Sequence, residues 1–89
     1  MITKDQSTAL RRVIMRYARN RHQGLWILGE LIGRKADSFD DVTEEEWGAV
    51  LRSDVRRALS LDSATAWAQK MYQLKRRHEK EVLGQMELF

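Results

Sequence analysis

The feature that most restricts the fold of this chain is the absence of proline from all 89 residues. Proline interrupts helices because it lacks an amide hydrogen and its ring clashes with the preceding turn. The apolar residues recur at intervals of three and four, which is the spacing of one helical face. The chain suffices for one domain, near the lower size limit for a self-sufficient core. We therefore predict an all-α fold: a compact bundle of about four helices over residues 1–84, followed by a short extended peptide, residues 85–89.

Capping residues and apolar spacing locate the first two helices. Thr3 and Gln6 have the spacing of a capping box, which predicts a helix that begins at Thr3. Its apolar face would consist of Leu10, Val13, Ile14 and Tyr17. We expect residues 20–24 to break or kink this helix and a second helix to cover residues 25–32. The second helix is apolar on most sides and should be the most buried element, with Gly33 as its C-terminal cap.

A loop over residues 34–42 precedes the clearest helix start in the sequence. Thr43 and Glu46 form a capping box, while Val42 and Trp47 have the spacing of a hydrophobic staple. The expected core face of this third helix is Trp47, Val50, Leu51, Val55, Ala58 and Leu59.

The fourth helix is expected to begin after Asp62 or Ser63, to run to about Leu83, and to end at Gly84. Its inner stripe would comprise Ala64, Trp67, Ala68, Met71, Leu74 and, at its edge, His78. The three tryptophans occupy apolar-face positions and are interpreted as core anchors: Trp26, Trp47 and Trp67.

The sequence offers little that could perform catalysis or bind a metal. It contains no cysteine and only two histidines, His22 and His78, whereas a metal site needs several convergent ligands. No Ser–His or Cys–His pattern of a nucleophile with its base is evident. His78 lies one helical turn from Glu81, which we interpret as a solvated or capping position. We predict a protein that is not an enzyme and that binds no metal and no cofactor.

No part of the sequence indicates a membrane protein. The longest apolar run falls far short of the roughly 20 residues that cross a bilayer. The first residues also lack the pattern of a secretory signal. We therefore expect a cytoplasmic protein.

Basic residues are concentrated in the first third of the chain. Residues 1–35 carry eight Lys and Arg against two Asp and Glu, whereas residues 36–62 carry three against eight. On a 3.6-residue helix, a basic stripe would project opposite the apolar face, formed by Arg12, Arg16 and Arg19 and flanked by Arg11 and Arg21. A second basic run is Lys75, Arg76 and Arg77.

Arginine forks suit phosphate oxygens, so these residues are candidates for contact with an acidic partner or with the backbone of DNA or RNA, without much sequence preference. The alternatives are a solvated polar face and attraction between the basic and acidic segments within the fold.

The last five residues, Gln85-Met86-Glu87-Leu88-Phe89, place two large apolar side chains at the end of the chain. This pentapeptide resembles the short motif, usually Gln-Leu-Ser/Asp-Leu-Phe, by which bacterial replication and repair proteins dock on the β sliding clamp. Gln85, Leu88 and Phe89 match its defining positions, whereas Met86 and Glu87 are conservative departures that would weaken the affinity. The resemblance implies that Leu88 and Phe89 fill a hydrophobic pocket of the clamp, with Gln85 at its edge. The alternative is that Leu88 and Phe89 fold back and close the core.

Taken together, these features predict a non-enzymatic accessory protein of DNA replication, repair or recombination. It would dock on a sliding clamp through residues 85–89 and contact DNA or a protein partner through its basic helix. The alternative is a small phage-type inhibitor, or interaction module, that blocks a host nucleic-acid enzyme with its charged surface.

Overall fold

The structure is a computed structural model that describes residues 2–59 and 64–83. Its elements, in chain order, are α1 (Lys4–Met15), α2 (Arg21–Ile32), α3 (Glu44–Glu46), the π-helical turn η1 (Trp47–Leu51), α4 (Arg52–Leu59), α5 (Ala64–His78) and the π-helical turn η2 (Glu79–Leu83). No strand occurs within the two described ranges. The predicted all-α bundle is confirmed. The expected helix end at Gly84 and the peptide at 85–89 lie outside the described residues.

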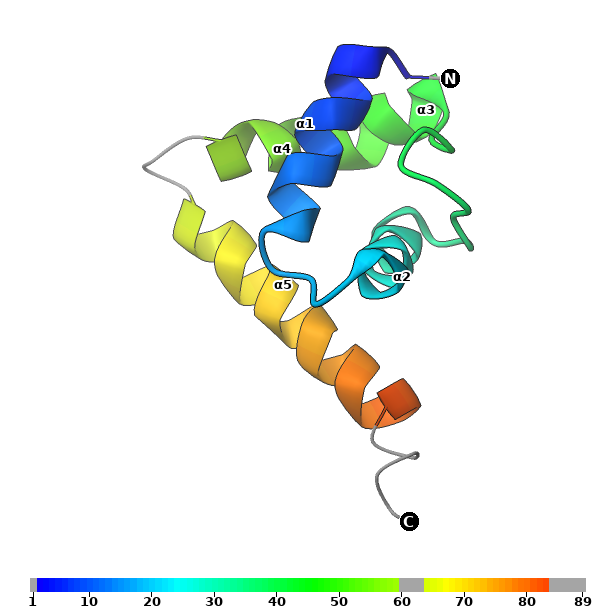
Figure 1. Cartoon of the computed structure of the whole chain (residues 1–89). Coiled ribbons are helices and arrows are strands. Elements are labelled where there is room, and N and C mark those ends of the chain that lie inside the picture. Colours follow the sequence, from blue (N-terminus) through cyan, green and yellow to red (C-terminus); the bar gives the residue numbers. More distant parts are fainter. Residues whose placement is uncertain (1, 60–63, 84–89) are drawn as a thin grey trace.

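Helix α5 holds the bundle together, because both α2 and α4 pack against it. Figure 1 shows α5 running diagonally, with α1 and α4 near its first half and α2 beside its second half. Helix α1 packs on α2 and α4 and closes the core from the other side. The fully buried apolar side chains come from α1, α2, η1 and α5 and from the loop before α3, and include Leu10, Ile14, Ile27, Leu28, Val42, Leu51 and Met71. None of the helices in the described part of the chain combines the length and apolar composition that crossing a membrane requires.

Helix α1 begins as predicted and ends earlier than its sequence pattern suggests. Thr3 and Gln6 form both hydrogen bonds of the capping box, and the Leu10, Val13 and Ile14 side chains are buried. The helix ends at Met15, so Tyr17 lies beyond it and is half-buried. The end of the helix leaves its last carbonyl groups without helical partners. The indole Nε1 of Trp67 on α5 supplies one, donating to the Val13 carbonyl at 3.0 Å.

The expected break at residues 20–24 is wrong, because the chain turns at residues 16–20 and α2 starts at Arg21 instead of Leu25. Asn20 is the cause: its side-chain oxygen accepts the Gln23 backbone N–H at 2.9 Å and so begins the helix. Gly33 ends the helix as predicted, in the left-handed conformation with φ 79°.

Helix α2 is the most buried of the four main helices, as expected, with only Arg21, His22 and Glu30 exposed among its twelve residues. Its inner face buries Ile27 and Leu28 completely, whereas Leu25 and Trp26 remain half-buried. Their side faces an open hollow, which is described below. Of the three tryptophans, Trp67 is buried, whereas Trp26 and Trp47 pack against the edge of the core.

The third predicted helix starts with the expected capping box of Thr43 and Glu46. It then widens into η1, where the Arg52 N–H bonds to the Trp47 carbonyl five residues before it. The extra residue in this turn changes the angular positions that follow. Leu51, Val55 and Ala58 are buried as predicted. The expected core positions Val50 and Leu59 are wrong.

Val50 is 40% exposed and Leu59 is 51% exposed. The wide turn carries Val50 away from the core. Leu59 lines an open hollow between α1 and α4 that neither helix covers.

The inner stripe of α5 is confirmed for Trp67 and Met71, which are buried, and Leu74 is half-buried. His78 is confirmed as part of this stripe, because only 1% of it is exposed. Its other interpretation, as a solvated or capping residue, is therefore wrong. His78 is the last residue of α5, and α2 covers it there, with the Trp26 ring 5.0 Å from the His78 ring.

Candidate functional site

Three arginines surround a hollow between α1, the first turn of α2 and the loop before α3. Its volume is about 500 Å³, and it is lined by Thr8, Arg11, Arg12, Met15, Arg21 and Phe39. A smaller hollow of about 200 Å³ shares four of these residues and adds Lys4, Ser7, Ser38 and Asp40. We call the two together the basic hollow.

Two features of the sequence bring these side chains together: their spacing along α1, and the turn that connects α1 to α2. On α1, Lys4, Thr8, Arg11, Arg12 and Met15 follow intervals of three and four, so they share one face. This face is turned away from Leu10, Val13 and Ile14, which enter the core. The turn capped by Asn20 then returns the chain, so that Arg21 at the start of α2 lies beside the same face.

The floor of the basic hollow is apolar. Phe39 is 4% exposed and belongs to the core, and Met15 is half-buried beside it. An apolar floor reduces the access of water to the arginine stems and strengthens their attraction for an anion. Phe39 could not be predicted to lie here, since loop residues give no periodic signal.

The loop that carries Phe39 is held in place by Arg34. The five N–H groups of this guanidinium make five hydrogen bonds: to both carboxylate oxygens of Glu46 at 2.7 and 2.8 Å, to the carboxylate and the carbonyl of Asp41 at 3.2 and 2.8 Å, and to the Lys35 carbonyl at 3.2 Å. The guanidinium lowers the pKa of Glu46 to about 2 and also lowers the pKa of the Asp41 carboxyl. At the far end of the loop, the Ser7 hydroxyl donates to the Asp40 carboxylate, which ties the loop to α1.

The arginines of the basic hollow are free to bind a partner. Within residues 2–59 and 64–83, Arg11, Arg12 and Arg21 form no ion pair. All three are exposed. The one acidic side chain that lines the hollow, Asp40, is already bonded to Ser7. The hollow therefore carries a local excess of positive charge.

None of the other predicted basic residues lines the basic hollow, although Arg16 lies one turn from Arg12. The stripe on a continuous helix is wrong, because α1 ends before Arg16 and Arg19. Arg16 is exposed at the C-cap, and Arg19 lies in the following turn, 3.6 Å from the Glu79 carboxylate. Lys75, Arg76 and Arg77 lie on α5 and contribute nothing to the basic hollow.

Of these three α5 residues, Arg77 is committed to ion pairs. It pairs with Glu30 at 2.8 Å and with Glu81, four residues later on the same helical face, at 3.5 Å.

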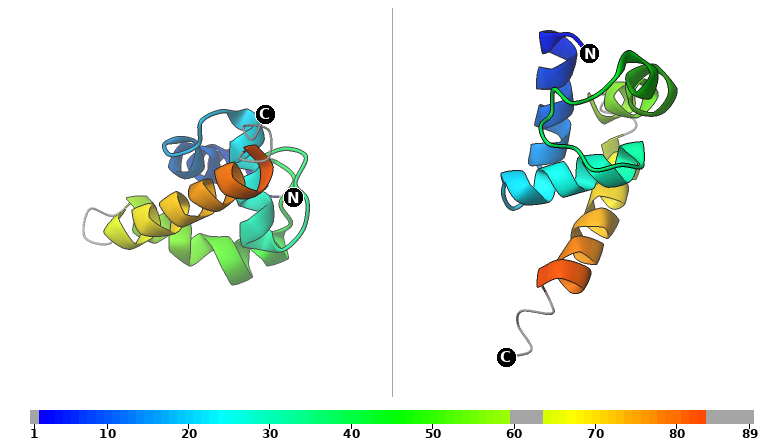
Figure 2. Two further views of the ribbon diagram at one scale, coloured as in Figure 1. Left: turned by 90° about the horizontal axis from the view of Figure 1, so that it is seen from below. Right: turned by 90° about the vertical axis from the view of Figure 1, so that its right-hand side faces the viewer.

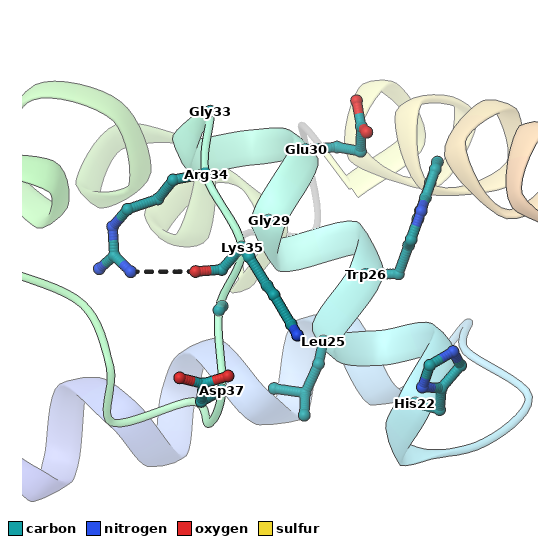
Figure 3. Close-up of a pocket in the computed structure, with 10 residues that line it drawn as sticks. His22, Leu25, Trp26, Gly29, Glu30, Gly33, Arg34, Lys35 and Asp37 are labelled. Carbon is teal, nitrogen blue, oxygen red and sulfur yellow. Dashed lines mark hydrogen bonds between the residues drawn. The ribbon is translucent and has the colours of Figure 1, made fainter.

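A second hollow, which the sequence analysis missed, lies along the outer face of α2. It has a volume of about 660 Å³ and is lined by His22, Leu25, Trp26, Gly29, Glu30, Gly33, Arg34, Lys35, Ala36 and Asp37. Figure 3 shows the Lys35 side chain reaching from the loop toward Leu25. The loop lies this close because position 29 lacks a side chain: a Cβ there would lie 2.8 Å from the Arg34 carbonyl oxygen. The only hint of this close approach in the sequence was the pair of glycines four residues apart, Gly29 and Gly33.

Two histidines lie at the end of this second hollow, where α2 meets α5. The His78 ring packs 5.0 Å from the Trp26 ring and 5.9 Å from the His22 ring, between centroids. Burial lowers the pKa of His78, and the nearby His22 lowers it further. In the described part of the chain, no group of three or more His, Cys, Asp or Glu side chains is placed to hold a metal ion.

Comparisons with protein-family models, curated proteins and solved structures found no match to this chain. The peptide Gln85, Met86, Leu88 and Phe89 lies outside the described residues. A functional proposal therefore depends on the geometry of the two hollows and on the sequence of that peptide.

Proposed function

We propose that this chain is a non-enzymatic accessory protein of DNA replication, repair or recombination. It would hold the phosphate backbone of a nucleic acid in the basic hollow and dock on a β sliding clamp through residues 85–89. The observation that carries the proposal is the convergence of Arg11, Arg12 and Arg21 on one hollow without ion-pair partners among the described residues.

A phosphate backbone suits the basic hollow for physical reasons. Arginine presents its donors in a rigid fork that matches two phosphate oxygens, and it keeps its charge at any physiological pH. Three such forks around one hollow can engage adjacent phosphates, while the Thr8 hydroxyl adds a neutral donor. Release of counterions from the nucleic acid would supply much of the affinity.

The proposed clamp contact is compatible with this arrangement. Helix α2 lies between α1 and η2 in the right-hand view of Figure 2. Residues 85–89 follow η2 in the sequence, whereas the basic hollow is built on the α1 side. A short apolar peptide can add affinity for a protein partner, while the charged domain directs the complex to nucleic acid.

Replacing Arg11, Arg12 and Arg21 together with alanine is expected to weaken nucleic-acid binding and to flatten its salt dependence. The slope of log K against log salt should become shallower by about 0.9 for each lost phosphate contact. Fluorescence anisotropy with a labelled oligonucleotide at several salt concentrations measures both quantities.

The matched control is the triple replacement of Arg52, Arg56 and Arg57 by alanine, which removes the same charge from exposed positions on α4. This control should lose much less affinity. If both triple variants lose the same affinity and slope, only net charge matters and the basic hollow is not a site.

Deleting residues 85–89 is expected to abolish binding to a bacterial β clamp while leaving the helix content and the melting temperature nearly unchanged. The wild-type interaction should be micromolar, about −8 kcal/mol, since ordering a short peptide offsets part of the apolar burial. Titration calorimetry with purified clamp measures the affinity, and circular dichroism measures the melting temperature. Replacing Leu88 and Phe89 with alanine should have the same effect as the deletion, whereas Glu87→Ala at a non-defining position should retain binding. A truncated protein that melts several degrees lower, from a parent without clamp affinity, would favour the fold-back alternative.

A further inference from the structure

Two tyrosines form an aromatic pair at the surface where the turn after α1 crosses α5. Their ring centroids are 5.6 Å apart, and the rings meet edge to face at 73°. Tyr17 is half-buried and packs against the core, whereas Tyr72 is 56% exposed. Figure 1 shows the turn between α1 and α2 passing beside α5. Contact with Tyr17 fixes the orientation of the Tyr72 ring and leaves much of it open to solvent.

The exposure of Tyr72 is unusual within this structure. Three large hydrophobic residues are exposed in the described part of the chain, and the other two are the aliphatic residues Val50 and Leu59. A tyrosine that merely covered the core would lie flat against it with its hydroxyl group outward. Tyr72 instead leaves 56% of its surface exposed while its ring contacts Tyr17 edge to face.

One exposed basic side chain lies one helical turn from Tyr72. Arg76 is four residues further along α5, and Glu79 at the start of η2 continues the same spacing, so the three share one face. The Arg19–Glu79 ion pair and the Tyr17–Tyr72 contact place the turn after α1 against that face. Arg76 on α5 is exposed and forms no ion pair among the described residues.

Arg16 connects the tyrosine pair with the basic hollow. It directly precedes Tyr17 and caps α1 with helical backbone angles, φ −61° and ψ −29°. Its N–H bonds to the Arg12 carbonyl at 3.3 Å, so Arg12 and Arg16 are neighbours one turn apart. Arg12 lines the basic hollow. Arg16 is therefore an exposed cation that lies along the chain between a residue of the hollow and the tyrosine pair.

We propose that Tyr72 is a stacking platform for an unpaired base and that the nucleic acid bound by this protein is single-stranded. Aromatic rings stack on bases of any sequence, and flanking cationic side chains hold the phosphates between them. A duplex keeps its bases paired and stacked inside, so it could use the arginines but not the tyrosine. This inference rests on the proposed function and specifies the substrate class of the same surface.

The test compares four labelled 15-mers: oligothymidine, oligouridine, an oligomer of abasic deoxyribose phosphates, and a duplex. Wild-type protein should bind oligothymidine or oligouridine more tightly than the abasic strand and the duplex. Tighter binding of oligothymidine would identify DNA as the natural substrate, and tighter binding of oligouridine would identify RNA. Tyr72→Ala should weaken binding of the base-containing single strands by about 5- to 150-fold, the usual effect of losing one stacked base. It should leave the affinity for the abasic strand unchanged. Tyr72→Phe, which keeps the ring, should bind like wild type.

The outcomes separate this inference from the proposed function. If Tyr72→Ala binds all four oligomers like wild type while the triple replacement of Arg11, Arg12 and Arg21 weakens them, the stacking platform is refuted and backbone binding stands. Equal losses on the thymidine and abasic strands would also refute stacking. If wild-type protein binds none of the four, both proposals fail. The melting temperature of Tyr72→Ala should stay close to that of wild type, because the side chain is more than half exposed.

Discussion

Replacing Trp67 with alanine is expected to lower the free energy of unfolding by about 3–5 kcal/mol, the usual cost of removing a buried tryptophan. A domain of this size has a total stability on the order of 4–13 kcal/mol, so this one change approaches the margin for folding. Trp67 is 5% exposed and lies in the core contributed by α1, α4 and α5. Alanine would leave a cavity where these helices meet.

The indole nitrogen of Trp67 adds a second effect. Because α1 ends at Met15, the Val13 carbonyl does not receive a helical hydrogen bond: the Tyr17 N–H, which would supply it, bonds to Ile14 instead. Trp67 Nε1 donates to that carbonyl at 3.0 Å in a buried position. Losing the donor would leave a buried acceptor unsatisfied, which costs about 1–3 kcal/mol.

Urea denaturation followed by circular dichroism can separate the two effects. Trp67→Phe retains most of the ring but not the donor, so it should lose about 1–3 kcal/mol. Trp47→Phe is the matched control, because Trp47 is only half-buried at the edge of the core. If Trp67→Phe is no less stable than Trp47→Phe, the bond to Val13 contributes nothing.

Helix ends could be predicted from the sequence because capping depends on a few neighbouring residues. The capping boxes at Thr3 and Thr43 and the left-handed cap at Gly33 all occur where the residue types indicate them. The break after α1 was predicted too late, at residues 20–24, because a glycine inside a helix gives the same local signal as a helix end. The capping oxygen of Asn20 begins α2 and keeps Gly24 inside it.

Features that depend on distant segments could not be predicted. Val50 is exposed because it lies in the π-helical turn, and Leu59 is exposed because it lines the hollow between α1 and α4. Neither feature follows from the spacing of apolar residues. Three residues of the candidate site, Arg11, Arg12 and Arg21, were recognised as basic. The sequence did not show that they share a hollow, since its floor comes from Phe39 in a loop that Arg34 holds.

Tyr72 was not recognised either. Its partner Tyr17 lies 55 residues earlier in the chain, a separation at which no local pattern connects two residues. Gln23 and His78 are also 55 residues apart, so the sequence did not indicate the hydrogen bond between them, which joins α2 to the buried His78 on α5.

Lowering the pH from about 8 to about 5 is expected to destabilise the protein, and His78 is the expected cause. Gln23 Oε1 accepts the Arg19 backbone N–H at 2.6 Å, so Gln23 Nε2 faces His78 Nδ1, 3.2 Å away. His78 Nδ1 must therefore accept, and the neutral ring carries its proton on Nε2, which is buried without a partner. Protonating Nδ1 would set two donors against each other and bury a charge near His22.

The sign of the pH effect follows from the direction of the pKa shift. Burial lowers the pKa of His78 below its ordinary value of 6.5, and Glu79 opposes this only in part. As the pH falls below 6.5, the unfolded chain takes up a proton at this residue before the folded chain does, so the free energy of unfolding falls. The ion pair between Arg34 and Glu46 affects stability only at lower pH. The pKa of Glu46 is lowered from 4.5 to about 2, so the pair stabilises the fold fully above pH 4.5 and loses this effect as the pH falls toward 2.

Urea midpoints measured at several pH values between about 8 and about 5 can test this expectation. His78→Phe should be less stable than wild type at pH 8 by roughly 1–3 kcal/mol, since Gln23 Nε2 loses its acceptor. Its stability should fall less between pH 7 and 5 than that of wild type, because the titrating group is gone. His22→Ala is the matched control and should keep most of the slope, since burial is the main cause of the His78 shift. If His78→Phe retains the full slope and His22→Ala loses it, the acid sensitivity belongs to the exposed histidine and the buried ring does not titrate in this range.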